Sequence, residues 1–289
     1  MRAAALAPAD AYRAPAANDA FGEVMVGGLR TACLSRVQLA AQMTRDCLAA
    51  RKTAAAPKLV FAANGHAVAL AGHDAGFAEL FQAADLVHAD GQAIVFASRL
   101  TSRAIPERSA TTDFIHDAAR MAVEQGLRFF LLGATEEANK RAAEILEQEY
   151  PGLQIVGRRH GYFSIDEEED ICDEINLTAP DVIWVGLSVP REYEFAVRNR
   201  PFLRAGWLVT SGGCFNFITG SYTRAPAWMQ KSGLEWAYRL WREPKRLFWR
   251  YAITNPVAIF LLLTRTTSRI ADRTAPTLPR QDLPTRLAS

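Results

Sequence analysis

The sequence predicts an α/β fold: a Rossmann-like, mostly parallel sheet with helices on both faces, followed by a C-terminal helical, membrane-associating appendage. Short apolar runs alternate with amphipathic segments through most of the chain, as is typical of a parallel sheet covered by helices. The chain has 289 residues, of which 49% are hydrophobic and 22% charged. It is therefore long and apolar enough to bury one sizeable core.

Four short apolar runs are expected to form buried strands. They are residues 59–63, 129–133, 182–186 and 207–210. Helices are expected between and after them, at residues 111–125, 135–150, 166–177 and 190–200. Thr135 with Glu136 and Glu137 is a helix start signal, and Pro151-Gly152 is the matching stop signal.

Changes in composition divide the chain into four parts. They are a disordered leader (1–20), the α/β domain (21–223), a basic and aromatic-rich helical appendage (224–273) and a disordered tail (274–289). The leader lacks the apolar core of a signal peptide. Pro244 is expected to start one of the two or three helices of the appendage. The apolar run 257–263 is well short of the roughly 20 residues that span a bilayer, so no crossing is expected.

The net charge of +2 conceals an asymmetry along the chain. From Arg224 onward there are 12 basic and 4 acidic residues, a charge of +8, and the rest carries −6. Four arginines recur there at helical spacing among large aromatic residues: Arg239, Arg242, Arg246 and Arg250. Such a stripe suits lipid headgroups or a diphosphate. A solvated basic face is the alternative, and nucleic acid is not expected, because no recognisable binding module accompanies the charges.

The absence of several known motifs argues against the classes of protein that depend on them. No G-x-G-x-x-G follows a predicted strand and no P-loop motif occurs, which argues against a dinucleotide enzyme or a P-loop NTPase. The five His and four Cys residues show no metal-ligand spacing, and D-x-D is absent, so no metal and no other cofactor is expected. The scattered cysteines also exclude a disulfide framework and fit a reducing cytosol.

The residues that follow each predicted strand are the candidate binding residues, because ligands of open parallel sheets bind beyond the carboxyl ends of the strands. These turns are Asn64-Gly65-His66, Asp90-Gly91-Gln92, Gly133-Ala134-Thr135, Gly186-Leu187-Ser188 and Ser211-Gly212-Gly213. Glycine in every turn lets backbone amides approach a diphosphate closely. Glycine is equally common as structural punctuation, so both interpretations stay open.

Asp90 is the candidate general base, because it follows the apolar stretch 84–89 and precedes Gly91, which places a carboxylate at a strand end. A general base must lie within hydrogen-bond reach of the acceptor hydroxyl and be ionised when it acts. The alternative is the N-cap of the helix that follows, a role that Asp often fills. Spacing alone favours the cap.

Between about residues 21 and 251 the chain resembles the WecG/TagA/CpsF family, also called glycosyltransferase family 26. The matching segments are Asn64, Ala84-Asp85, Asp90-Gly91, Glu107-Arg108, Thr112-Asp113, Tyr150-Pro151-Gly152-Leu153, His160-Gly161-Tyr162-Phe163, Pro180-Asp181, Val185-Gly186-Leu187 and Pro190. The most specific matches are Gly220, Arg224-Ala225-Pro226, the run Gly233-Leu234-Glu235-Trp236-Ala237-Tyr238-Arg239, Glu243-Pro244, Arg246 and Arg250-Tyr251.

The resemblance implies an inverting, metal-independent glycosyltransferase that moves a hexose-type sugar from a UDP-sugar to a polyprenyl-diphosphate-linked sugar. Such an enzyme serves the synthesis of bacterial exopolysaccharide, capsule, enterobacterial antigen or teichoic-acid type polymers. It implies a cytoplasmic protein, peripheral on the inner face of the cytoplasmic membrane, and it is compatible with a homo-oligomer. A catalytically altered, membrane-associated scaffold of a polysaccharide assembly complex is the alternative.

The resemblance also assigns roles to residues. Asp90 corresponds to the proposed base, and Asn64 to an asparagine of the active site. The other candidates for substrate binding are Arg108, Asp113, Gly186, Pro190, Glu192, Gly212 and Gly213. The arginines expected to contact the acceptor diphosphate or the membrane are Arg224, Arg239, Arg246 and Arg250.

Four residues differ from the family pattern and bear on which donor sugar the protein binds. Ala62 replaces a usual Thr, Glu192 a Gln, Thr111 a Gly and Asn216 an Asp. A carboxylate at position 192 accepts hydrogen bonds from hydroxyl groups but repels a nearby phosphate. The donor sugar therefore need not be the N-acetylmannosamine that is usual in the family.

Overall fold

The protein is described by a computed structural model that covers residues 21–53 and 55–269; the predicted leader and tail lie outside these residues. At its centre is a parallel six-stranded sheet in the order β4-β3-β8-β7-β5-β6. The strands are β3 (Lys58–Ala63), β4 (Leu86–Ala89), β5 (Arg128–Gly133), β6 (Gln154–Arg159), β7 (Val182–Gly186) and β8 (Trp207–Thr210). The predicted fold class is confirmed.

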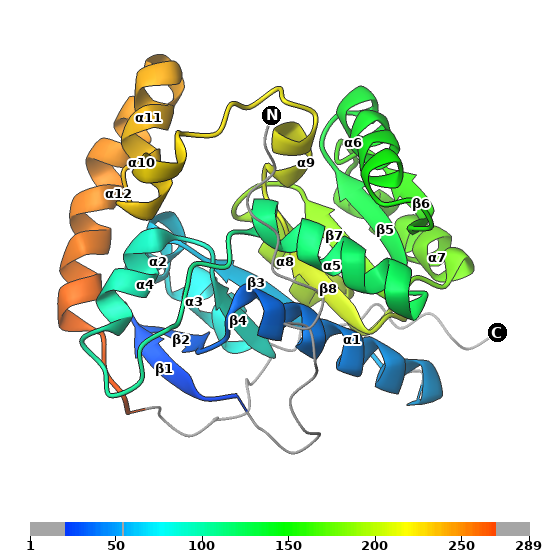
Figure 1. Cartoon of the computed structure of the whole chain (residues 1–289), viewed down its shortest axis with the longest axis horizontal. Helices are drawn as coiled ribbons and strands as arrows, with labels where there is room; N and C mark the ends of the chain where they lie inside the picture. Colours follow the sequence, from blue (N-terminus) through cyan, green and yellow to red (C-terminus); the bar gives the residue numbers. More distant parts are fainter. Residues whose placement is uncertain (1–20, 54, 270–289) are drawn as a thin grey trace.

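Helices cover both faces of the sheet (Figure 1). One face packs against α1 (Arg36–Thr53), α5 (Thr111–Gln125), α6 (Glu136–Glu149) and α9 (Cys214–Ile218). The other packs against α2 (Gly65–His73), α3 (Ala75–Gln82), α4 (Gln92–Ser98), α7 (Glu168–Thr178) and α8 (Arg191–Asn199). The helix predicted from residue 166 begins as a short 3-10 turn, Ile165–Glu167, before α7.

The alternation of side chains along each strand builds two core layers. On β5, Phe130 and Leu132 face one layer, and Phe129 and Leu131 face the other. All four side chains are fully buried, as expected for a central parallel strand.

The N-terminal hairpin, β1 (Glu23–Val26) and β2 (Leu29–Ala32), stands apart from the main sheet. Gly27 and Gly28 form its turn with φ values of +60° and +87°, the left-handed conformation that glycine adopts most easily. Met25 exchanges two backbone hydrogen bonds with Thr267, of 3.0 and 2.9 Å. The hairpin is therefore bonded to the segment that follows the last helix of the described chain.

Three helices follow residue 224: α10 (Ala227–Lys231), α11 (Glu235–Arg242) and α12 (Pro244–Thr264). Pro244 is the first residue of α12, as the sequence predicts. Figure 1 shows α12 running beside α2 and α4 along one edge of the molecule. Leu261 and Leu262 belong to the same buried cluster as β3, so α12 contributes to the core of the α/β fold.

Candidate active site

The turns after four adjacent strands meet at one edge of the sheet, because the strands are parallel. Asn64 follows β3, Asp90 follows β4, and Ser211 follows β8, while Gly186 ends β7. This is the edge at which open parallel sheets bind ligands.

The carboxylate of Asp90 is held by three hydrogen bonds, one of them from the Thr111 hydroxyl to Oδ1 over 3.4 Å. The Asn64 side-chain amide donates to its Oδ2 over 3.2 Å, and the backbone amide of Thr111 donates to its Oδ1 over 2.9 Å. Arg108 Nε donates to the backbone carbonyl of Asp90 over 2.6 Å, which places a guanidinium beside the carboxylate. Oδ2, which accepts one hydrogen bond, keeps a further lone pair for a substrate proton.

The surroundings of Asp90 favour its charged form. Burial raises the pKa of Asp90, but the charge of Arg108, the neighbouring His88 and the bonds from Thr111 and Asn64 outweigh burial and leave this pKa below the usual value. Asp90 is therefore ionised at neutral pH, as a general base must be.

Asp90 is not the cap of the helix that follows it. The N-cap residue of α4 is Gly91, which makes no side-chain capping bond. Asp90 instead accepts a hydrogen bond from the backbone amide of Thr111, the first residue of α5. Gly91 is needed for a close approach of two turns, because a Cβ there would lie 3.0 Å from the Cα of Asn64. Asn64 caps α2 by accepting from Ala67 over 3.1 Å, which directs its NH₂ group to Asp90.

A network of partly buried ion pairs joins the sheet edge to the appendage. Glu235, on α11, pairs with Arg108 over 2.6 Å and with Arg224 over 3.7 Å. Arg224 also pairs with Asp113 over 2.5 Å. Arg108 and Asp113, predicted to bind substrate, and Arg224, predicted to contact the acceptor diphosphate or the membrane, therefore belong to one network: Glu235 bridges the two arginines, and Arg224 holds Asp113.

Glu192 lies inside the protein, with only 2% of its surface exposed. Its Oε2 accepts from the backbone amide of Gly212 over 2.8 Å, which links the first turn of α8 to the turn after β8. Burial raises the pKa of Glu192 to about 8; the Gly212 amide opposes this rise, and the charge of Asp90 adds to it. The predicted repulsion of phosphate thus depends on whether Glu192 carries a proton.

Packing explains two of the strand-end glycines. A Cβ on Gly133 would lie 2.3 Å from the carbonyl oxygen of Gly186, and one on Gly186 would lie 2.9 Å from that of Gly212. Gly212 itself has a φ of +52°. Gly213 lies against Tyr222, whose ring would be 3.3 Å from a Cβ there.

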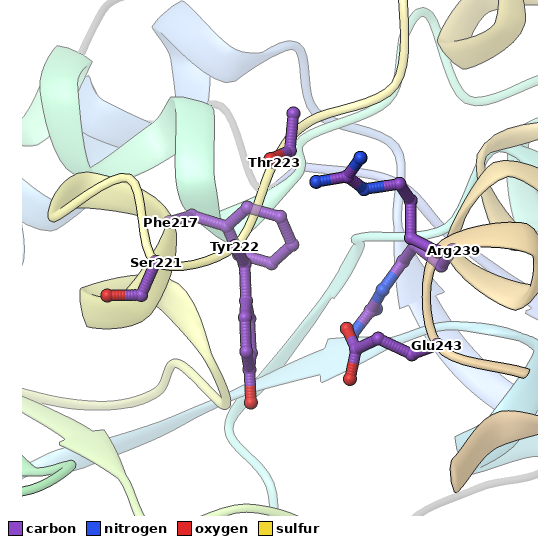
Figure 2. A pocket seen from close by; sticks show the side chains of 7 residues that line it. Phe217, Ser221, Tyr222, Thr223, Arg239 and Glu243 are labelled. Carbon is purple, nitrogen blue, oxygen red and sulfur yellow. The ribbon is translucent and has the colours of Figure 1, made fainter. Parts of the chain in front are cut away.

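A cavity of about 340 Å³ lies between the segment after α9 and helix α11 (Figure 2). Its lining residues are Phe217, Ser221, Tyr222, Thr223, Arg239, Arg242 and Glu243. The Arg239 guanidinium lies 5.5 Å from the centre of the Phe217 ring, and that of Arg246 lies 5.4 Å from the centre of the Tyr222 ring. The cavity is thus bordered by the arginines Arg239 and Arg242 and by the rings of Phe217 and Tyr222.

The arginines predicted for the appendage have different partners, although Arg242, like Arg239, lines the cavity. Arg239 lines the cavity, Arg246 lies at Tyr222 and pairs with Glu243, and Arg224 belongs to the ion-pair network. Arg250 lies near the start of α2, where burial and its charge lower the pKa of His66 to about 4. Pro190 is exposed just before α8.

Large apolar side chains are exposed on the three appendage helices. They are Trp228, Trp236, Trp241, Phe248, Trp249, Ile253, Ile259, Phe260 and Leu263. Within the described residues, α12 is the one helix long and apolar enough to cross a membrane, although core helices also pass that test. The sequence-based expectation of no crossing rested on residues 257–263 alone, and these belong to a helix of 21 residues.

Sequence reasoning assigned no individual role to three participants in this site. Glu235 and the Thr111 amide become visible only through contacts between distant segments. The Ser211 hydroxyl is buried and has no hydrogen-bond partner within the described chain, although its turn was recognised. No group of three or more His, Cys, Asp or Glu side chains suited to a metal is found in residues 21–53 and 55–269.

The chain is similar to known proteins over much of its length. The model of the glycosyl transferase WecG/TagA/CpsF family matches residues 24–271. The N-acetylglucosaminyldiphosphoundecaprenol N-acetyl-beta-D-mannosaminyltransferase of Bacillus subtilis (strain 168) is 28% identical over 183 residues, 63% of this chain and 70% of that protein. The protein with the same name from Staphylococcus aureus (strain MRSA252) is 29% identical over 188 residues, 65% and 73% of the two chains. The chain belongs to the WecG/TagA/CpsF family of glycosyltransferases.

Proposed function

We propose that the protein transfers a hexose-type sugar from a UDP-sugar to a polyprenyl-diphosphate-linked sugar, with inversion and without a metal. The observation that carries this proposal is the ionised carboxylate of Asp90, held by Asn64 and Thr111 at the sheet edge where ligands bind. The names of the relatives describe transfer of N-acetylmannosamine to a diphosphoundecaprenol-linked N-acetylglucosamine. They support the same class of acceptor here.

In the proposed reaction, Asp90 takes the proton from the acceptor hydroxyl while that oxygen attacks the anomeric carbon of the donor. The new glycosidic bond forms on the face opposite the leaving group, and the bond from the anomeric carbon to the UDP oxygen breaks. UDP leaves with the bonding electron pair. One displacement inverts the anomeric centre, and Asn64 keeps the carboxylate oriented.

Without a metal, the negative charge on the departing diphosphate needs fixed donors. The turns after β7 and β8 are proposed to hold this diphosphate, and the Ser211 hydroxyl, which has no partner within the described residues, offers a donor there. Arg108 stands beside Asp90 and supplies positive charge at the same edge. These groups are in place before the reaction, so little reorganisation accompanies the bond breaking.

The cavity between α9 and α11 is the proposed site for the acceptor diphosphate. Arg239 and Arg242 line it, and guanidinium groups bind phosphate oxygens through paired N–H groups. Phe217 and Tyr222 offer aromatic surfaces beside them for the attached sugar or lipid. In Figure 2, Arg239 and Glu243 lie across the hollow from Tyr222.

The exposed aromatic residues of α11 and α12 are proposed to hold the protein on the inner face of the cytoplasmic membrane. Trp241 and Trp249 are 73% and 71% exposed, and Arg246 lies between them in sequence. Indole rings and arginines together favour the interface between headgroups and acyl chains. The acceptor, itself anchored in that membrane, would meet the cavity at its surface.

Replacing Asp90 by Asn tests the catalytic proposal. UDP release in the presence of a synthetic lipid-diphosphate acceptor is expected to fall by about 10² or more, while UDP binding persists. Asp173→Asn, on the exposed face of α7, is the matched control. Near-normal turnover of Asp90→Asn would remove Asp90 from the role, and no UDP release by the unchanged protein would favour the non-catalytic scaffold.

Membrane attachment is tested by changing Trp241 and Trp249 to Ser and measuring flotation with anionic vesicles. Deleting the appendage would be a poorer test, because it would remove buried α12 residues such as Leu261. Leu177→Ser, at an apolar position of α7 that is 88% exposed, is the control. Unchanged flotation of the double variant would exclude this surface as the anchor.

A further inference from the structure

The carboxyl group of Glu192 sits where two strand-end turns meet. Its Oε2 accepts the Gly212 amide from the turn after β8, and the amides of Ser188 and Leu187, from the turn after β7, also bond to this carboxyl group. These turns are the ones proposed above to hold the donor diphosphate. Glu192 is therefore placed at the donor site, although its residue type is acidic.

Within residues 21–53 and 55–269, Glu192 forms no ion pair with an arginine or lysine, and the partners of its carboxyl group are backbone amides. The titratable groups that face it are Asp90 beyond β4, Tyr193 on its own helix and Cys214 at the start of α9. Burial raises the pKa of the Tyr193 hydroxyl and of the Cys214 thiol, so both are uncharged between pH 7 and pH 9. Asp90 is the one charged group among them, and it has the same sign as an ionised Glu192.

The other elements packed against α8 bring no counter-charge to this point. The charged residues of β3 and β7 lie at their opposite ends, where Lys58 begins β3 and Asp181 precedes β7. On α3, Glu79 is exposed. A buried carboxylate with only amide partners and a like charge nearby is unfavourable compared with the neutral acid.

We propose that Glu192 binds the donor as an uncharged carboxylic acid, accepting the strand-turn amides and donating its own proton to an oxygen of the donor diphosphate. This inference rests on the proposed function, since it takes the sheet edge to be the UDP-sugar site. A neutral acid offers both an acceptor and an O–H donor, as a carboxamide side chain does. The ionised form offers acceptors alone and would repel the diphosphate.

The proposal predicts that UDP binds the protonated protein. With the pKa of Glu192 raised to about 8 by burial, the dissociation constant of UDP is expected to increase about tenfold from pH 7 to pH 9. The terminal phosphate of UDP does not contribute to most of this change, because phosphate monoesters have a pKa of about 6 and are almost fully ionised above pH 7.5.

The test is isothermal titration of the full chain with UDP between pH 7 and pH 9.5. Glu192→Gln keeps an acceptor and a donor but cannot titrate, and its affinity is expected to change less than about twofold over the range. Glu194→Gln, an exposed neighbour on α8, should behave as the unchanged protein. A flat profile for the unchanged protein, or the same slope in Glu192→Gln, would overturn the proposal.

A second measurement avoids any dependence on the variant. Titrations at pH 8.5 in buffers of different ionisation enthalpy are expected to show uptake of about three quarters of a proton per UDP bound. Absence of uptake would also overturn the proposal. Failure of the unchanged protein to bind UDP at any pH would instead contradict the proposed function itself, so the two failures are distinguishable.

Discussion

Replacing Glu192 by Gln is expected to remove a pH-dependent loss of stability, independently of any ligand. The pKa of Glu192 is raised from 4.5 to about 8 on folding, chiefly by burial. The folded state therefore binds this proton more tightly than the unfolded state. The resulting stability is fully present below pH 4.5 and is lost as the pH rises toward 8.

The magnitude follows from the two pKa values. At about 1.4 kcal/mol per pKa unit, the difference between 4.5 and about 8 corresponds to about 5 kcal/mol once Glu192 is fully ionised in both states. About 3 to 4 kcal/mol of this loss is expected between pH 5 and pH 8. Gln cannot ionise, so the Glu192→Gln variant should lack this slope while all other titrating groups remain.

Urea unfolding of both proteins at pH 5, 6, 7 and 8 measures the effect. The quantity of interest is the free energy of unfolding of Glu192→Gln minus that of the unchanged protein, which cancels the contributions of histidines and other carboxylates. This difference should grow by about 3 to 4 kcal/mol across the range. A difference that stays constant within about 0.5 kcal/mol would refute the argument that Glu192 is buried without a compensating charge.

Three further variants test the geometry. Gly186→Ala is expected to lower the free energy of unfolding by about 1–3 kcal/mol in urea titrations, because its Cβ would lie 2.9 Å from the Gly212 carbonyl; unchanged stability would show that the turns can separate. Tyr193→Phe should cost about 1 kcal/mol in the same assay, since its hydroxyl donates to the Ala62 carbonyl over 2.9 Å, and a neutral result would mean that water replaces it. Glu235→Gln should speed hydrogen exchange in α10 and α11 about fivefold by weakening the pairs with Arg108 and Arg224; equal exchange would deny that these pairs hold the helices.

The sequence predicted the central strands and helices well where apolar periodicity and end signals agree. The helix predicted at residues 111–125 matches α5, whose end is marked by Gly126 with a φ of +63°. Strand β6 escaped prediction, because it lies at the edge of the sheet and its half-exposed residues include Arg158 and Arg159. Such a strand has no continuous apolar run.

The residues of the candidate site also differ in whether the sequence could predict them. The strand-end rule located Asn64 and Asp90 without any coordinates, since both follow apolar runs. The rule does not reveal partners, and the pair of Arg108 with Glu235 joins residues 127 positions apart. The state of Glu192 was also beyond the sequence, because its pKa depends on burial and on distant amides.

The hydrogen bonds between Met25 and Thr267 bring the two ends of the described chain together in space. Proteins whose ends meet are suited to circular permutation, because a short linker can join them without distorting the fold. New ends could be opened at the exposed residues around Phe202, in the turn before β8. A permuted protein of this kind would carry labels or surface tethers at the start of a strand, whereas Asp90 and Gly212 follow the carboxyl ends of theirs.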